Sequence, residues 1–207
     1  MIPRLCYISD GERGTGGRPL RDVLVRLAHG GVRLVILREP DARAAEVADW
    51  MQALAPFRAS GLRVLASRRL DWARAFGMDG VHLAADAIPV AEARGWLGPE
   101  ALIGYSAHSA AEARRVEQSG ASYVTLSPIY PTGSKPGAPG RGESWLAEAT
   151  SELGIPALAL GGLRPSRVPG VLGAGAWGVA AVSALGAAAD IEAAAGDFAA
   201  ALLEAKE

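Results

Sequence analysis

Short apolar runs alternate with amphipathic segments along the whole chain. Most of the runs are apolar at nearly every position, which is typical of parallel strands that are covered on both faces. The pattern predicts strands over eight segments: residues 4–9, 33–38, 62–67, 79–84, 101–106, 122–127, 156–161 and 177–183.

Several segments between these runs carry apolar residues at helical spacing. They predict helices over residues 18–31, 41–61, 109–120, 165–176 and 190–207. Asp41 is the expected N-cap of the second helix, and Ser109 begins the third with a capping-box spacing to Glu112. The fourth pattern is interrupted by Pro169 and Gly170.

The alternation of strands and helices repeats about every 26 residues, which favours a single (β/α)8 TIM barrel of the α/β class. An open doubly wound sheet is the alternative. No linker divides the sequence, so we expect one domain over residues 1–207. The glycine-rich segment 9–19 falls where a loop between a strand and a helix belongs.

Composition narrows the class of protein further. Half of the 207 residues are hydrophobic and the formal net charge is -1, without the basic excess of a nucleic-acid-binding protein. No apolar run has the length of a membrane span, and the N-terminus does not have the pattern of a signal peptide. We therefore expect a cytoplasmic protein that binds neither nucleic acid nor membrane. Its single cysteine, Cys6, is expected to be a small buried residue.

In a barrel of this kind the chemistry lies in the loops that follow the strands. Gly161 and Gly162 follow the seventh predicted strand, and Ser183 follows the eighth. The loops at these two positions commonly bind phosphate, because backbone N–H groups there can approach an anion. The sequence therefore predicts a phosphate site beside Gly161, Gly162 and Ser183.

The segment 127–142 follows the sixth predicted strand and is half glycine and proline. It contains Thr132, Ser134 and Lys135, and only one other lysine occurs in the chain. Hydroxyl groups and a lysine ammonium suit a phosphate or a developing anion. From composition alone, a solvated loop with an incidental lysine is an equal alternative.

The three histidines have different expected roles. His108 follows the fifth strand, next to the strand-tip Ser106, and is either a general base or a structural residue. His82 lies within an apolar strand and is expected in the core. His29 ends a predicted helix, where a cation is favourable.

Six segments, in order, resemble the thiamine phosphate synthase superfamily, which includes the thiazole tautomerases (TenI-like proteins). They are "ILRE", "DGVHL", "IGYSAHSAAEA", "YVTLSPIYPTGSKPG", "ALALGGLRP" and "GAGAWGVAAVSAL". The resemblance covers nearly the whole chain and implies a (β/α)8 barrel. It implies that Ser106, Thr132, Ser134, Lys135, Gly161, Gly162 and Ser183 bind the thiazole phosphate. It also implies that barrels of this kind commonly pair, so a homodimer is an expectation.

The synthases of this superfamily join a pyrimidine pyrophosphate to a thiazole phosphate with the help of magnesium. Their pyrophosphate and metal positions are mostly changed here. The synthase pattern Gln-x-Arg-x-Lys corresponds to Ile36, Arg38 and Pro40, and the Asn-Asp pair after the third strand corresponds to Ser67 and Arg68. Magnesium and its carboxylate ligands neutralise a pyrophosphate leaving group, so their loss argues against an efficient synthase.

The tautomerases need fewer functional groups in the active site, because they aromatise a carboxythiazole phosphate by proton transfer without a metal. Arg38 and Arg141 could bind the phosphorylated substrate, and Arg141 could do so by contacting the carboxylate of the substrate. The tautomerases carry a histidine just after the sixth strand, where this chain has Pro128. His108 or Glu39, together with Lys135, then becomes the expected catalytic group.

Three functions follow from these observations. The first is a metal-independent thiazole tautomerase, an isomerase without a cofactor that acts on a small phosphorylated thiazole. The second is a thiamine phosphate synthase, a transferase that couples hydroxymethylpyrimidine pyrophosphate to thiazole phosphate and requires Mg²⁺. The third is a non-catalytic protein that binds thiamine intermediates. The sequence favours the first.

Overall fold

Parallel strands close into a barrel in the order in which they occur along the chain. The computed structural model describes residues 1–134, 137 and 139–205, and within these residues the barrel has eight strands. The strands are β1 (Leu5–Ile8), β2 (Leu34–Leu37), β3 (Arg63–Ser67), β4 (Gly80–Leu83), β5 (Leu102–Ala107), β6 (Tyr123–Leu126), β7 (Ala157–Leu160) and β8 (Gly178–Ala181). The pairing of Leu5 with Val179 closes the barrel between β1 and β8. The predicted barrel and all eight predicted strands are confirmed.

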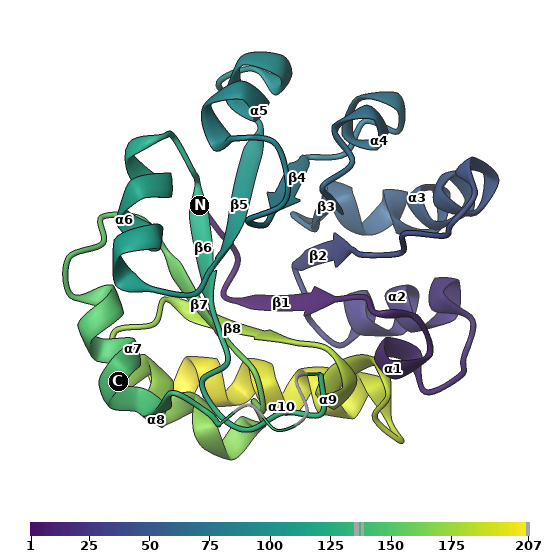
Figure 1. Ribbon diagram of the computed structural model, residues 1–207. Helices are drawn as coiled ribbons and strands as arrows, with labels where there is room; N and C mark the ends of the chain where they lie inside the picture. The colour runs from purple at the N-terminus through teal and green to yellow at the C-terminus, as the bar shows by residue number, and fades with distance from the viewer. Residues whose placement is uncertain (135–136, 138, 206–207) are drawn as a thin grey trace.

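The helices surround the strands on the outside of the barrel (Figure 1). They are α1 (Gly11–Thr15), α2 (Leu20–His29), α3 (Ala44–Ala59), α4 (Leu70–Ala75), α5 (Val90–Leu97), α6 (Ala110–Gln118), α7 (Gly142–Thr150), the 3-10 helix η1 (Pro165–Arg167), α8 (Val168–Gly173), α9 (Ser183–Gly186) and α10 (Ile191–Glu204). In the described part of the chain, none of these helices is long and apolar enough to cross a bilayer.

The ends of the predicted helices are partly correct. The Ser109 hydroxyl accepts a hydrogen bond from the Glu112 N–H and caps α6, as predicted. The Asp41 cap is wrong, because the chain turns once more before α3 and Arg43 becomes the N-cap. There the Glu46 carboxylate accepts the Arg43 N–H at 2.9 Å, which satisfies the start of the helix in place of Asp41.

Two other segments differ from the sequence expectation. The predicted loop over residues 9–19 contains the short helix α1, which the Tyr7 hydroxyl anchors by donating to the Gly14 carbonyl at 2.8 Å. The interrupted pattern over residues 165–176 forms two helices in succession, η1 and α8. Pro169 lies in the first turn of α8, where a missing N–H costs no helical hydrogen bond.

Most strands contribute to two apolar layers. On β1, Cys6 and Ile8 point into the barrel, whereas Leu5 and Tyr7 pack outward against the helices. Removing such side chains from water contributes about 1.5–3 kcal/mol each. Cys6 is fully buried in the inner layer, as predicted, and burial raises the pKa of its thiol.

Candidate functional site

The carboxyl ends of the strands surround two adjoining cavities at the barrel mouth. The smaller one, here called the β7–β8 cavity, has a volume of about 130 Å³. The larger one, the central cavity, has a volume of about 260 Å³. Both are lined by Ser127, Ser134, Leu160 and Val182, so the two cavities are contiguous.

The floor of the β7–β8 cavity depends on two glycines. Gly161 and Gly162 have positive φ angles of 101° and 63°, in the region that favours glycine. A Cβ atom on Gly162 would lie 2.5 Å from the carbonyl oxygen of Pro131. The loop after β7 can therefore approach the loop after β6 only with glycine here.

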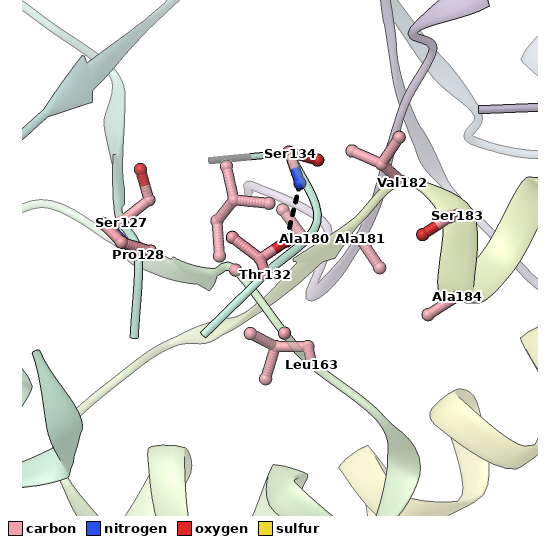
Figure 2. A pocket seen from close by; sticks show the side chains of 13 residues that line it. Ser127, Pro128, Thr132, Ser134, Leu163, Ala180, Ala181, Val182, Ser183 and Ala184 are labelled. Atoms are coloured by element: carbon pink, nitrogen blue, oxygen red, sulfur yellow. Dashed lines mark hydrogen bonds between the residues drawn. The ribbon is translucent and has the colours of Figure 1, made fainter. Parts of the chain in front are cut away.

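Hydroxyl groups face this cavity from two sides (Figure 2). Thr132 and Ser134 come from the loop after β6, and the Ser134 N–H donates to the Thr132 hydroxyl at 3.3 Å. Ser183, the first residue of α9, lies across from them. The structure thus brings these predicted phosphate-binding residues together with Gly161 and Gly162, whereas Lys135 lies outside the described residues.

The described lining of the β7–β8 cavity has no side chain that titrates near neutral pH. The remaining lining residues are Pro128, Leu163, Ala180, Ala181 and Ala184. Pro128 therefore occupies the wall where a proton-transferring histidine is expected in a tautomerase. This wall can bind an anion, but it offers no general base or acid.

A chain of polar groups crosses the barrel interior beneath the central cavity. The His82 Nδ1 atom lies 3.0 Å from the Tyr123 hydroxyl, and its Nε2 atom lies 2.9 Å from the Ser106 hydroxyl. Thr125 also donates to the Ser106 hydroxyl, at 3.3 Å. His82 is buried, as predicted, yet it also lines the central cavity. The position of His82 at this cavity was not predicted, because its neighbours in the sequence are apolar.

The proton positions in this chain follow from burial. Burial lowers the pKa of His82 to about 3, so its imidazole is neutral at ordinary pH. Burial also raises the pKa of Tyr123 well above its usual value, so its phenol keeps its proton. A buried phenol proton needs an acceptor, which His82 Nδ1 provides, and Nε2–H then donates to Ser106. Because Ser106 accepts from both His82 and Thr125, its own proton is available to a ligand.

His108 lies at the junction of the two cavities. Its side chain lines the central cavity, and its Nδ1 atom lies 3.2 Å from the carbonyl oxygen of Ser127. A carbonyl oxygen only accepts, so Nδ1 carries the proton and Nε2 is left as an acceptor in the neutral ring. The backbone N–H of His108 donates to the Glu112 carboxylate at 2.7 Å, which fixes the start of α6 beside the site.

Arginine side chains line the other side of the central cavity. Arg38 follows β2 and pairs with Asp10, which also pairs with Arg13 at 3.2 Å. Arg68 follows β3 and pairs with Asp86 at 2.7 Å. Arg38 is an expected site residue, whereas Arg13 and Arg68 had no predicted binding role, although both follow strand ends, where this fold places its chemistry.

Two predicted site residues lie away from the β7–β8 cavity. Glu39 faces the β1–β3 side of the barrel, where its carboxylate accepts the Gly11 N–H at 3.2 Å. The Arg141 guanidinium lies over the Trp145 ring of α7, 4.5 Å from its centroid. Neither residue lines the β7–β8 cavity or the central cavity.

The acidic residues near the mouth do not fit a magnesium ion of the kind that the family resemblance implies. Magnesium is usually bound by one or two carboxylates together with water and substrate phosphates. Within residues 1–134, 137 and 139–205, no three His, Cys, Asp or Glu side chains are grouped as metal ligands. Asp10 and Asp86 are each engaged by arginine instead. The donor set here is cationic rather than metal-binding.

Comparisons with known proteins agree on one family. Residues 5–185 match the family described as "Thiamine monophosphate synthase". The chain is 36% identical over 192 residues to the thiamine-phosphate synthase of a Roseiflexus species, covering 92% of this chain and 81% of the relative. It is 39% identical over 178 residues to that of Syntrophomonas wolfei, covering 85% of each.

Solved structures give the same result. The thiamine phosphate pyrophosphorylase of Pyrococcus furiosus superposes with a TM-score of 0.85 at 25% identity, covering 99% of this chain and 97% of that structure. These relatives overturn the expectation of a tautomerase, because they are named as synthases, which are transferases and not isomerases. The physical reason for the error is that the lost metal positions were given more weight than Pro128, which leaves the described wall of the β7–β8 cavity without a group that transfers a proton.

Proposed function

The chain belongs to the thiamine monophosphate synthase family, and on this premise we propose that it couples hydroxymethylpyrimidine pyrophosphate to thiazole phosphate. The products are thiamine phosphate and inorganic pyrophosphate. The observation that carries the proposal is the pair of contiguous cavities at the barrel mouth. Two contiguous cavities can hold two substrates side by side, in the proximity that a coupling reaction needs.

The β7–β8 cavity suits the thiazole phosphate. Its polar lining consists of hydroxyl groups and glycine backbone, including Thr132, Ser134, Gly162 and Ser183. Within the described part of the chain, no carbonyl or side chain accepts a hydrogen bond from the N–H of Gly162 or Ser183. These N–H groups are therefore available to phosphate oxygens.

The central cavity suits the pyrimidine pyrophosphate. The shared wall of Ser127, Leu160 and Val182 would bring the thiazole ring next to the pyrimidine. The Ser106 hydroxyl can donate to the pyrimidine or to its leaving group, because His82 and Thr125 occupy its acceptor positions. The arginine side of the cavity matches the charge of the diphosphate.

The chemistry of coupling needs no general base beside the thiazole, and the described lining of the β7–β8 cavity provides none. The thiazole nitrogen forms a bond to the exocyclic carbon of the pyrimidine, and the bond from that carbon to the diphosphate oxygen breaks. Pyrophosphate leaves with the electron pair, and no proton is removed from either reactant. Tautomerisation would require proton transfer beside the thiazole, where Pro128 provides none.

The direct test is to incubate the purified protein with both precursors and to measure thiamine phosphate by chromatography. Parallel reactions contain either magnesium or a chelator, and controls omit one precursor. Product above the buffer rate in either condition supports the proposal. Absence of product in both conditions would contradict it, and tight binding without turnover would select the non-catalytic protein instead.

A further inference from the structure

Two guanidinium groups face the central cavity from the ends of neighbouring strands. Leu37 of β2 pairs with Ala66 of β3, so Arg38 lies level with Ser67, and Arg68 is the next residue along the chain. Arg38, Ser67 and Arg68 line the central cavity and also a third cavity, of about 260 Å³, between these strand ends. This arrangement gives one continuous space whose wall carries Arg38 and Arg68, with Arg69 and Glu39 on its outer part.

We propose that Arg38 and Arg68 bind the diphosphate of the substrate directly and take the place of a magnesium ion. The inference rests on the proposed coupling function, and it specifies how the pyrophosphate leaving group is neutralised in this chain. Guanidinium groups stay charged at any working pH and bind phosphate oxygens through two parallel N–H groups.

The balance of charge in the central cavity supports anion binding. Arg13, Arg38 and Arg68 line it, whereas Asp10 is the carboxylate in its described lining. Asp10 is held by two of these arginines, and its side chain is 19% exposed. Asp10 therefore orients Arg38 through their ion pair. The three arginines outnumber this one carboxylate, so the described lining of the cavity has an excess of positive charge.

The pair between Arg68 and Asp86 is easily exchanged for a ligand. The two side chains are 47% and 66% exposed, and ion pairs exposed to this extent contribute little to stability. Asp86 does not line the central cavity, whereas Arg68 does. A diphosphate can therefore take over the Arg68 guanidinium while Asp86 returns to water.

The backbone of Arg68 is fixed in an unusual conformation. Its φ angle is 62°, which is rare for a residue other than glycine, and its N–H donates to the His82 carbonyl at 2.9 Å. This hydrogen bond connects the end of β3 to β4 and holds the Arg68 side chain over the cavity. Glycine would satisfy the backbone better, so the side chain present here has a use other than folding.

Calorimetric titration with inorganic pyrophosphate tests the inference without relying on catalysis. We compare the wild-type protein in EDTA and in magnesium, then Arg68→Gly and Arg38→Ala in EDTA. The matched control is Arg114→Ala, which removes an equal charge from α6 at its pair with Glu152. Arg68→Gly suits the local backbone, so loss of folding does not confuse the result.

We expect binding in EDTA with an affinity within about twofold of that in magnesium. We expect Arg68→Gly and Arg38→Ala each to weaken it by about tenfold or more, and Arg114→Ala to leave it unchanged. Binding that requires magnesium, or equal effects of the Arg68 and Arg114 variants, would overturn the inference. Coupling that occurs only with magnesium would leave the proposed function intact, whereas metal-free pyrophosphate binding without coupling would refute only that function.

Discussion

The Nε2 atom of His82 lies 2.9 Å from the Oγ atom of Ser106, which joins a buried histidine to a hydroxyl at the barrel mouth. Because the imidazole is neutral and its Nδ1 atom accepts a hydrogen bond from the Tyr123 hydroxyl, Nε2–H donates to Ser106 and makes this hydroxyl a donor toward the cavity. The orientation of the Ser106 hydroxyl in the candidate site is therefore set from within the barrel core.

Replacing Ser106 with alanine should lower kcat/KM for coupling by about tenfold or more, because one oriented hydrogen bond to the substrate is lost. It should also lower the free energy of unfolding by about 1–3 kcal/mol, since His82 Nε2–H and the Thr125 hydroxyl lose their acceptor. Steady-state kinetics and urea denaturation measure the two effects.

Ser109→Ala is the matched control for Ser106→Ala. It removes the N-cap of α6 and should cost about 1 kcal/mol of stability. It should leave kcat/KM nearly unchanged, because Ser109 does not line either cavity. An equal loss of activity in both variants would show that Ser106 acts only through stability.

Stability should fall in acid because of His82. Burial lowers its pKa to about 3 in the folded protein, from an unfolded value near 6.5, so the unfolded chain binds the extra proton between these values. The contribution is complete above pH of about 6.5 and decreases by up to about 1.4 kcal/mol per pH unit as the pH falls toward 3.

Denaturant unfolding at pH values of about 7.5, 6 and 5, at and below the unfolded pKa of His82, would compare the wild type with His82→Gln. The glutamine side chain does not titrate, so its unfolding free energy should depend less steeply on pH. Identical slopes for the two proteins would show that His82 is not the group responsible.

Gly162→Ala should destabilise the protein by about 1–3 kcal/mol and weaken binding of thiazole phosphate. The new Cβ would meet the Pro131 carbonyl at 2.5 Å, and the φ angle of 63° is unfavourable for alanine. Gly196→Ala, at an open position within α10, should instead stabilise by about 0.5–1 kcal/mol. Thermal unfolding and ligand titration distinguish the two glycines.

Arg68→Gly should be more stable than Arg68→Ala by about 1 kcal/mol. Both variants lose the pair with Asp86, so their difference isolates the cost of a positive φ angle at a residue with a Cβ. Urea denaturation measures this difference. Equal stability would mean that the backbone relaxes when the guanidinium is removed.

Lys135→Ala should weaken binding of thiazole phosphate more than binding of the same thiazole without its phosphate. This prediction comes from the sequence, because the only lysine before Lys206 lies in the loop after β6. An ammonium group contributes mainly to the charged ligand. Equal weakening of both ligands, measured by titration, would show that Lys135 does not contact phosphate.

The barrel could be predicted from the sequence because each strand is buried on both faces. Runs such as residues 34–37 and 157–160 are apolar at every position, and the recurrence of such runs leaves few alternatives to a closed parallel sheet. The start of α3 could not be predicted in the same way. Asp41 and Arg43 compete for one cap, and the side chain of Glu46 decides between them.

The candidate site was predictable on one side only. Gly161, Gly162 and Ser183 follow strand ends at the usual phosphate position of this fold, and the structure brings them together. The arginine side depends on ion pairs between residues far apart in sequence, such as Arg38 with Asp10. His82 was hidden because its polar partners, Tyr123 and Ser106, come from other strands.

Gly104 leaves the space in which His82 and Tyr123 meet, since a Cβ atom there would lie 2.5 Å from His82 Nδ1 and 2.3 Å from Tyr123 Cζ. These three positions therefore cannot diverge independently during evolution. A lineage that acquires a larger residue at position 104 must also abandon the imidazole or the phenol, and the hydroxyl at the mouth would then lose its fixed direction.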